Sequence, residues 1–214
     1  MHDVQKIVLS IVPLLFAIIL HEVSHGWVAE KLGDPTARML GRITLNPIPH
    51  IDLMGTIIIP GILLLTGSHF LFGWAKPVPV NFGNLRNGRR DMALVALSGP
   101  LSNFLLAVLS SIIFHLTSSG PTGSGGISDR IVVPLHAMAA YSVLFNLMLM
   151  VINLCPILPL DGGRIVAGLA PETIALALVR MERYGMLIVV LLIASGMWSY
   201  LFTPIIQLFW RILM

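Results

Sequence analysis

Two histidines and a glutamate in the segment His21-Glu22-Val23-Ser24-His25 carry the clearest chemistry in this chain. Residues four positions apart share one face of a helix, so His21 and His25 can point their imidazole nitrogens at one metal ion. Glu22 follows the first ligand directly and can reach a water molecule bound to that metal. The pattern H-E-x-x-H is typical of zinc proteases, in which the histidines hold zinc and the glutamate acts as general base.

The setting of this motif is apolar. It lies in a run from Ile7 to Ala29 that is long enough to cross a bilayer. Ionisable side chains inside a membrane span are energetically expensive, and by default they mark a functional site. The alternative is that the histidines only form hydrogen bonds with polar groups of neighbouring helices. We favour a metal site that performs hydrolysis within a membrane.

The composition is that of an integral membrane protein. The 214 residues are 56% hydrophobic and 11% charged, with a mean hydropathy of +0.90, whereas a soluble domain carries about 25% charged residues. The net charge of +3 indicates no nucleic-acid partner, because membrane topology itself requires basic residues in loops. The single cysteine, Cys155, excludes an intrachain disulfide and a cysteine zinc cluster. We expect one membrane domain over residues 1–214.

Five apolar stretches have about the 20 residues that a membrane span needs: 7–30, 53–72, 91–116, 132–156 and 185–203. The positive-inside rule favours four crossings, with 53–72 entering and leaving on one side. Of the thirteen basic residues, only Lys6, Arg130 and Arg211 then lie on the opposite side. Pro60-Gly61 also interrupts 53–72 at its middle. We therefore predict a re-entrant segment there, both termini outside, and the metal site near the cytoplasmic side.

Two segments that flank 53–72 have the pattern of strands. Ala37 to Leu45 alternates polar and apolar side chains, which is a period of two. Lys76 to Val80 contains two prolines, which cannot donate backbone hydrogen bonds and belong at a sheet edge. We expect a small membrane-associated β-hairpin near the cytoplasmic face, with an irregular loop as the alternative. The predicted fold is an all-α polytopic membrane protein with about four transmembrane helices, the re-entrant segment and this hairpin.

A third metal ligand must come from another part of the chain. A catalytic zinc usually takes three protein ligands and leaves the fourth position for water. Asp161 fits best, because it follows the third span in the sequence N-L-C-P-I-L-P-L-D-G-G-R at 153–164. The prolines end the helix there, and the glycines let the backbone turn closely around a metal. Glu30 is the rival ligand, but it lies more than one turn beyond His25.

Three asparagines lie in the predicted spans. Asn146 and Asn153 are seven positions apart on one face of the third span, and Asn103 lies just inside the second. Amide side chains in hydrocarbon need partners, and helix–helix hydrogen bonding supplies them. Near zinc, an amide can instead bind the substrate backbone or the oxyanion of a tetrahedral intermediate. All three are candidates for that role, with packing equally open for Asn153 and favoured for Asn103.

Three motifs in this order, H-E-x-x-H at 21–25, G-P-L-S-N at 99–103 and N-x-x-P-x-x-P-L-D-G-G at 153–163, resemble the site-2 protease family of intramembrane metalloproteases. Short bacterial members are the most similar. Many members carry a PDZ domain between two core spans or CBS domains at the C-terminus. The corresponding loop here, 117–130, is short and rich in glycine and serine, so we expect neither domain.

The resemblance implies that His21, His25 and Asp161 hold one Zn²⁺ ion and that Glu22 activates water. It also implies cleavage of transmembrane segments of membrane-anchored substrate proteins, in regulated intramembrane proteolysis at a bacterial cytoplasmic membrane. The competing hypothesis is a membrane metal transporter or a metal-binding scaffold without protease activity. Transporters typically show repeated halves and polar residues along a path, whereas this chain has one compact cluster.

Overall fold

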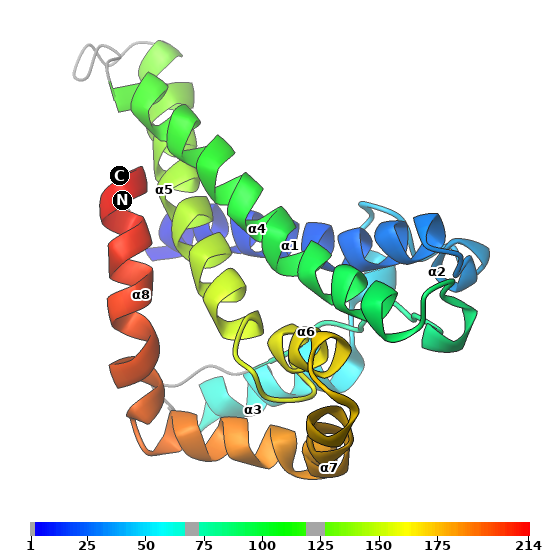
Figure 1. Cartoon of the computed structure of the whole chain (residues 1–214). Coiled ribbons are helices and arrows are strands. Elements are labelled where there is room, and N and C mark those ends of the chain that lie inside the picture. Colours follow the sequence, from blue (N-terminus) through cyan, green and yellow to red (C-terminus); the bar gives the residue numbers. More distant parts are fainter. Residues whose placement is uncertain (1–2, 67–72, 119–126) are drawn as a thin grey trace.

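A computed structural model describes residues 3–66, 73–118 and 127–214, and these residues form an all-helical protein. Three long helices cross at its centre (Figure 1): α1 (Asp3–Lys31), α4 (Arg89–Ser118) and α5 (Ile127–Asn153). The shorter elements are α2 (Thr36–Met39), α3 (Ile59–Leu65), α6 (Asp161–Leu169), α7 (Glu172–Ala194), α8 (Met197–Leu213) and the turns η1 (Ile48–His50), η2 (Leu53–Ile58) and η3 (Phe82–Asn84).

Helices α1, α4 and α5 each contain a stretch that is long and apolar enough to cross a membrane. They coincide with the predicted spans 7–30, 91–116 and, as far as Asn153, 132–156. The three helices contact one another, and small or branched apolar side chains such as Ala17, Ala107 and Val143 are fully buried between them. Leucines three or four positions apart on α4 remain exposed instead: Leu94, Leu97, Leu101, Leu105 and Leu109. Such a stripe suits contact with lipid.

The predicted span 185–203 does not form one straight helix. Helix α7 ends and α8 begins inside it, and the two are bent by 81°. Gly196 has a φ of +74°, the left-handed conformation that glycine adopts without steric cost and that commonly ends a helix. In the described part of the chain there are therefore three candidate spans, or four if α7 and α8 together form one broken span.

A shorter apolar element stands where the re-entrant segment is predicted. The π-helical turn η2 runs directly into α3, and residues 67–72 lie outside the described residues. Backbone hydrogen bonds join the two ends of this excursion. The Trp74 N–H donates to the Gly55 carbonyl at 3.1 Å, and the Lys76 N–H donates to the His50 carbonyl at 2.9 Å. The segment between His50 and Lys76 therefore begins and ends at the same point of the structure.

The predicted β-hairpin is wrong, since neither of its two segments, as the structure describes them, contains a strand. Ala37 lies in α2, and Gly41, with a φ of +64°, turns the chain soon after. The segments do lie side by side, because the Arg42 guanidinium donates to the carbonyls of Lys76 and Pro77 at 2.9 and 3.2 Å. Proline has no backbone N–H that could donate to a neighbouring strand. Here the Arg42 side chain joins the two segments instead of backbone pairing.

Helix α6 is held tightly against α4. A Cβ at Gly168 would lie 2.6 Å from the Arg89 carbonyl oxygen, so only glycine permits this approach. The Arg89 side chain donates to the Ala167 carbonyl at 2.8 Å and also to the Ala170 carbonyl. A cation at the C-terminal end of a helix satisfies its last carbonyls and its dipole. These contacts fix the helix that carries Asp161 at its first position.

Candidate metal centre and catalytic pocket

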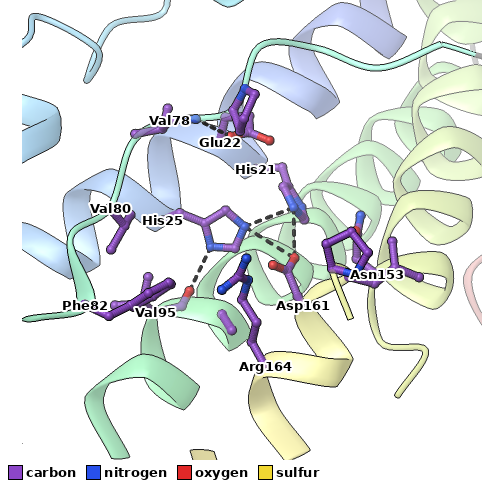
Figure 2. Close-up of a pocket in the computed structure, with 14 residues that line it drawn as sticks. His21, Glu22, His25, Val78, Val80, Phe82, Val95, Asn153, Asp161 and Arg164 are labelled. Atoms are coloured by element: carbon purple, nitrogen blue, oxygen red, sulfur yellow. Dashed lines mark hydrogen bonds and ion pairs between the residues drawn. The ribbon is translucent and has the colours of Figure 1, made fainter. Parts of the chain in front are cut away.

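Two histidines of α1 and one aspartate of α6 direct their ligand atoms at a common point (Figure 2). His21 and His25 are about one helical turn apart, and their Nε2 atoms are separated by 3.1 Å. Asp161 Oδ2 lies 3.1 Å from His21 Nε2 and 3.3 Å from His25 Nε2. The structure thus brings together the three predicted ligands, although Asp161 comes from a distant part of the chain.

The second ring nitrogen of each histidine has a defined partner. His25 Nδ1 donates to the Val95 carbonyl of α4 at 2.8 Å. His21 Nδ1 lies 2.6 Å from Asn103 Oδ1. The Asn103 amide nitrogen donates to the Ala17 carbonyl at 3.2 Å, so its oxygen faces His21 as an acceptor. In neutral imidazoles both Nδ1 atoms therefore carry the proton, and both Nε2 atoms present lone pairs.

Three acceptor atoms consequently converge on one point, and a cation between them relieves their mutual repulsion. Within the described residues, Asp161 Oδ2 is a buried oxygen with no hydrogen-bond donor. A tetrahedral zinc ion with bonds of about 2.0–2.1 Å sets its ligand atoms roughly 3.3–3.4 Å apart. The observed separations are 3.1 to 3.3 Å. The residues present therefore fit a zinc ion in both geometry and donor chemistry.

Gly99 of α4 makes room for both imidazole rings. A Cβ at this position would lie 2.5 Å from His25 Nε2 and 2.6 Å from His21 Cε1, which is far inside van der Waals contact. A small residue lets two membrane helices approach closely. Here that approach puts the backbone of α4 directly behind the metal ligands.

Glu22 lies beside the ligands in a cavity of about 390 Å³. Its Oε2 accepts a hydrogen bond of 2.7 Å from the backbone N–H of Val78, which holds the carboxylate at the cavity wall (Figure 2). The same cavity is lined by His21, His25 and Asp161. A carboxylate so close to a metal site can take a proton from a water molecule there.

The three candidate asparagines occupy two different kinds of place. Asn153 lines the cavity, and its amide donates to the Leu149 carbonyl of its own helix at 3.0 Å. Asn103 and Asn146 are buried behind the ligands, with 0% and 1% exposure. Asn103 Nδ2 donates to Asn146 Oδ1 at 2.8 Å, and Asn146 Nδ2 donates to the Ser142 carbonyl at 2.9 Å. A directed chain of hydrogen bonds thus runs from His21 to the backbone of α5.

Glu30, the rival ligand, lies away from the metal site. Both of its carboxylate oxygens accept from the Arg38 guanidinium, each at 2.7 Å. The bidentate geometry is that of a surface ion pair between α1 and α2.

Among the residues that line the cavity, Arg164 and Phe82 were not singled out by the sequence. Arg164 was visible only as the end of the motif that contains Asp161. It lies three positions after Asp161 on α6, and side chains three apart share a helix face. Phe82 carried no local signal, because the loop that brings it to the site gives no periodic pattern.

Curated relatives of this chain bear metalloprotease names. One from Bacillus subtilis, "Putative zinc metalloprotease YwhC", is 34% identical over 198 residues, which cover 92% of this chain and 85% of the relative. "Putative zinc metalloprotease Rip2" from Mycolicibacterium smegmatis is 29% identical over 193 residues, covering 88% of this chain and 67% of the relative. Rip2 from Mycobacterium tuberculosis is 31% identical over 167 residues, and the match covers 78% of this chain and 59% of that protein.

No protein-family model matches the chain. No solved structure matches it either.

Proposed function

Because this chain belongs to the site-2 protease family of zinc metalloproteases, we propose that it hydrolyses peptide bonds within transmembrane segments of membrane-anchored proteins. One observation carries the proposal: a zinc-like set of ligands and the Glu22 carboxylate share one cavity, and both histidines lie on a helix apolar enough to span a membrane. The alternative of a metal transporter or scaffold is not favoured, since the relatives bear metalloprotease names.

The proposed division of labour follows from the contacts. His21, His25 and Asp161 would hold the zinc ion, with both imidazoles oriented through their Nδ1 atoms. When bound, zinc lowers the pKa of a coordinated water toward neutrality and polarises the scissile carbonyl. Glu22 takes a proton from the attacking water and returns a proton to the leaving amine. Asn153 is available at the cavity wall to hold the substrate backbone.

Substrate must reach this cavity as an unwound segment, because a helix hides its peptide bonds in its own hydrogen bonds. The extended stretch at 76–80 lines the cavity, but several of its backbone groups are already engaged. Val78 donates to Glu22, and the carbonyls of Lys76 and Pro77 accept from Arg42. We therefore assign the unwound substrate to the cavity between this stretch and α6.

For the topology, we propose an integral protein of a bacterial cytoplasmic membrane, with both termini outside and the catalytic cavity near the cytoplasmic side. The basic residues support this orientation, since ten of the thirteen would then lie on the cytoplasmic side. The re-entrant segment would be 53–72, because backbone hydrogen bonds from Trp74 to Gly55 and from Lys76 to His50 join the chain at its two ends. The partners would be the lipid bilayer and a membrane-anchored substrate, with no nucleic acid.

The experiment is cleavage of a model substrate with one transmembrane segment, reconstituted with the purified protein in zinc-containing proteoliposomes. We expect wild type to cut within that segment. Glu22→Gln should retain zinc but lose cleavage by about 10²-fold or more. Glu30→Gln is the matched control, because it removes a carboxylate of the same helix that lies outside the cavity. Undiminished cleavage by Glu22→Gln, or zinc flux into vesicles without cleavage, would refute the proposal.

A further inference from the structure

Arg164 is a cation in the catalytic cavity to which the mechanism above gives no role. Among the described residues that line this cavity, it is the one with a permanent positive charge. Figure 2 shows its side chain extending from α6 toward His25 and Asp161.

The contacts of Arg164 leave most of its donors free. Its guanidinium carbon lies over the Phe82 ring, 5.1 Å from the centroid. Stacking on a ring face holds the plane of the guanidinium and leaves the N–H groups at its edge available. Among the described residues, its one hydrogen bond is from Nη2 to Glu182 Oε1 at 3.4 Å, well beyond the roughly 2.7–2.9 Å of a strong charge-assisted bond.

The ion pair with Glu182 is also partly exposed to solvent. The two side chains are 30% and 40% exposed, and pairs of this kind contribute little to stability. The guanidinium can therefore turn from Glu182 to a ligand in the cavity at small cost. Its planar fork matches a carboxylate with two parallel hydrogen bonds.

We propose that Arg164 is a substrate-binding residue that holds the carboxylate formed at the cut peptide bond. This inference rests on the proposed function. In hydrolysis the C–N bond breaks, the water oxygen joins the carbonyl carbon, and the amine nitrogen gains a proton. The acyl fragment thus ends in a new carboxylate inside the cavity. Before cleavage, the same donors face the carbonyl oxygen from which that carboxylate arises.

The test is equilibrium binding of two synthetic peptides to the full-length, zinc-loaded protein in detergent. Both carry the sequence of the acyl-side product of the model substrate, one with a free C-terminal carboxylate and the other with a C-terminal amide. Wild type should bind the acid more tightly than the amide. Arg164→Gln should weaken binding of the acid by about tenfold or more and leave binding of the amide unchanged. Arg164→Lys should give an intermediate loss, because it keeps the charge without the fork.

Glu182→Gln is the matched control, because it removes the ion pair on α6 and α7 but keeps the guanidinium. It should preserve the preference for the acid, and all variants should keep wild-type zinc content and thermal stability. Equal preference for the acid in Arg164→Gln and wild type would overturn the inference, and so would an equal loss in Glu182→Gln. Binding is measured without turnover, so this failure is distinct from a failure of Glu22→Gln to abolish cleavage.

Discussion

The two sides of the catalytic cavity are built differently. Behind the metal ligands, Asn103 and Asn146 are buried and form short hydrogen bonds with fixed direction. On the open side, the ion pair of Arg164 is long, and the stretch at 76–80 is held by the Arg42 side chain and one backbone hydrogen bond to His50 rather than by a sheet. The first side can hold a metal in one geometry. The second side can exchange its contacts for those of a substrate.

The difference teaches how a protease can work at membrane depth. Metal ligands need partners that do not move, because an ion tolerates little error in ligand position. A substrate that must unwind and leave again needs groups that are only weakly engaged beforehand. Changes on the closed side should therefore affect zinc first, and changes on the open side should affect substrate first.

The largest effect is expected from Asp161→Ala, which removes one of three ligands. The two imidazoles that remain would still face each other at a separation near 3.1 Å, but without a carboxylate to complete the site. We expect zinc content near zero after dialysis and cleavage at background, measured by metal analysis and by the proteoliposome assay. Stoichiometric zinc in this variant would remove Asp161 from the ligand set.

A change behind the ligands should rank second. Gly99→Ala introduces a Cβ 2.5 Å from His25 Nε2, so the ring must move or the helices must separate. Overpacking of this kind costs about 1–3 kcal/mol, and most of that cost should appear as lost zinc affinity. Gly61→Ala is the control, because a Cβ there meets nothing within 4 Å. Chelator competition measures the zinc affinity of both variants. Equal affinities would show that α4 can shift to accommodate the added methyl group.

Asn103→Leu should affect the same property by a comparable amount. It keeps the branched shape of the side chain but removes the acceptor that orients His21. Loss of such an orienting partner typically lowers metal affinity by about 10- to 100-fold. Ser110→Ala is the control, since it removes another buried polar contact between α4 and α5, that with Ser142, without touching a ligand. If both variants lower zinc affinity equally, the effect is one of packing rather than of orientation.

Much of the metal side could be predicted from the sequence because its signals are local. His21 and His25 share a helix face by spacing alone, and Asp161 follows a helix-ending pair of prolines. The break between α7 and α8 also had a local signal, the dipeptide Ser195-Gly196 inside the apolar run 185–203. The span was predicted from length and hydropathy, and neither of these depends on the backbone conformation of a single residue such as Gly196.

The open side could not be predicted in the same way, because its contacts join distant segments. The alternation at 37–45 is compatible with a strand, yet Arg42 reaches across to Lys76 and Pro77 and replaces backbone pairing. On the closed side, the place of Asn103 behind His21 was equally hidden, because it depends on how α4 crosses α1, which no local pattern determines. Arg164 likewise could not be assigned to the cavity from the sequence, because its position depends on how α6 packs.

The smallest effect is expected at Asp34, which ties the metal helix to the stretch that covers the cavity. Its buried carboxylate follows α1 and accepts from Asn81 N–H at 2.7 Å and Asn84 Nδ2 at 2.9 Å, as well as from the Thr36 hydroxyl. Burial alone raises the pKa of Asp34, but these donors outweigh it and hold the pKa below its ordinary value of 3.8. The stabilisation is therefore complete above pH 3.8 and disappears as the pH falls through the lower folded value.

Asp34→Asn should lower the midpoint of thermal unfolding modestly at pH 7 while leaving zinc affinity near wild type. As the pH falls below 3.8, the midpoints of variant and wild type should approach each other, because the wild-type carboxylate then loses its charge. Glu172→Gln, at an exposed position of α7, is the control and should change the midpoint less than Asp34→Asn at pH 7. A constant difference between Asp34→Asn and wild type from pH 7 down to pH 3 would mean that shape, not charge, links the two sides of the cavity.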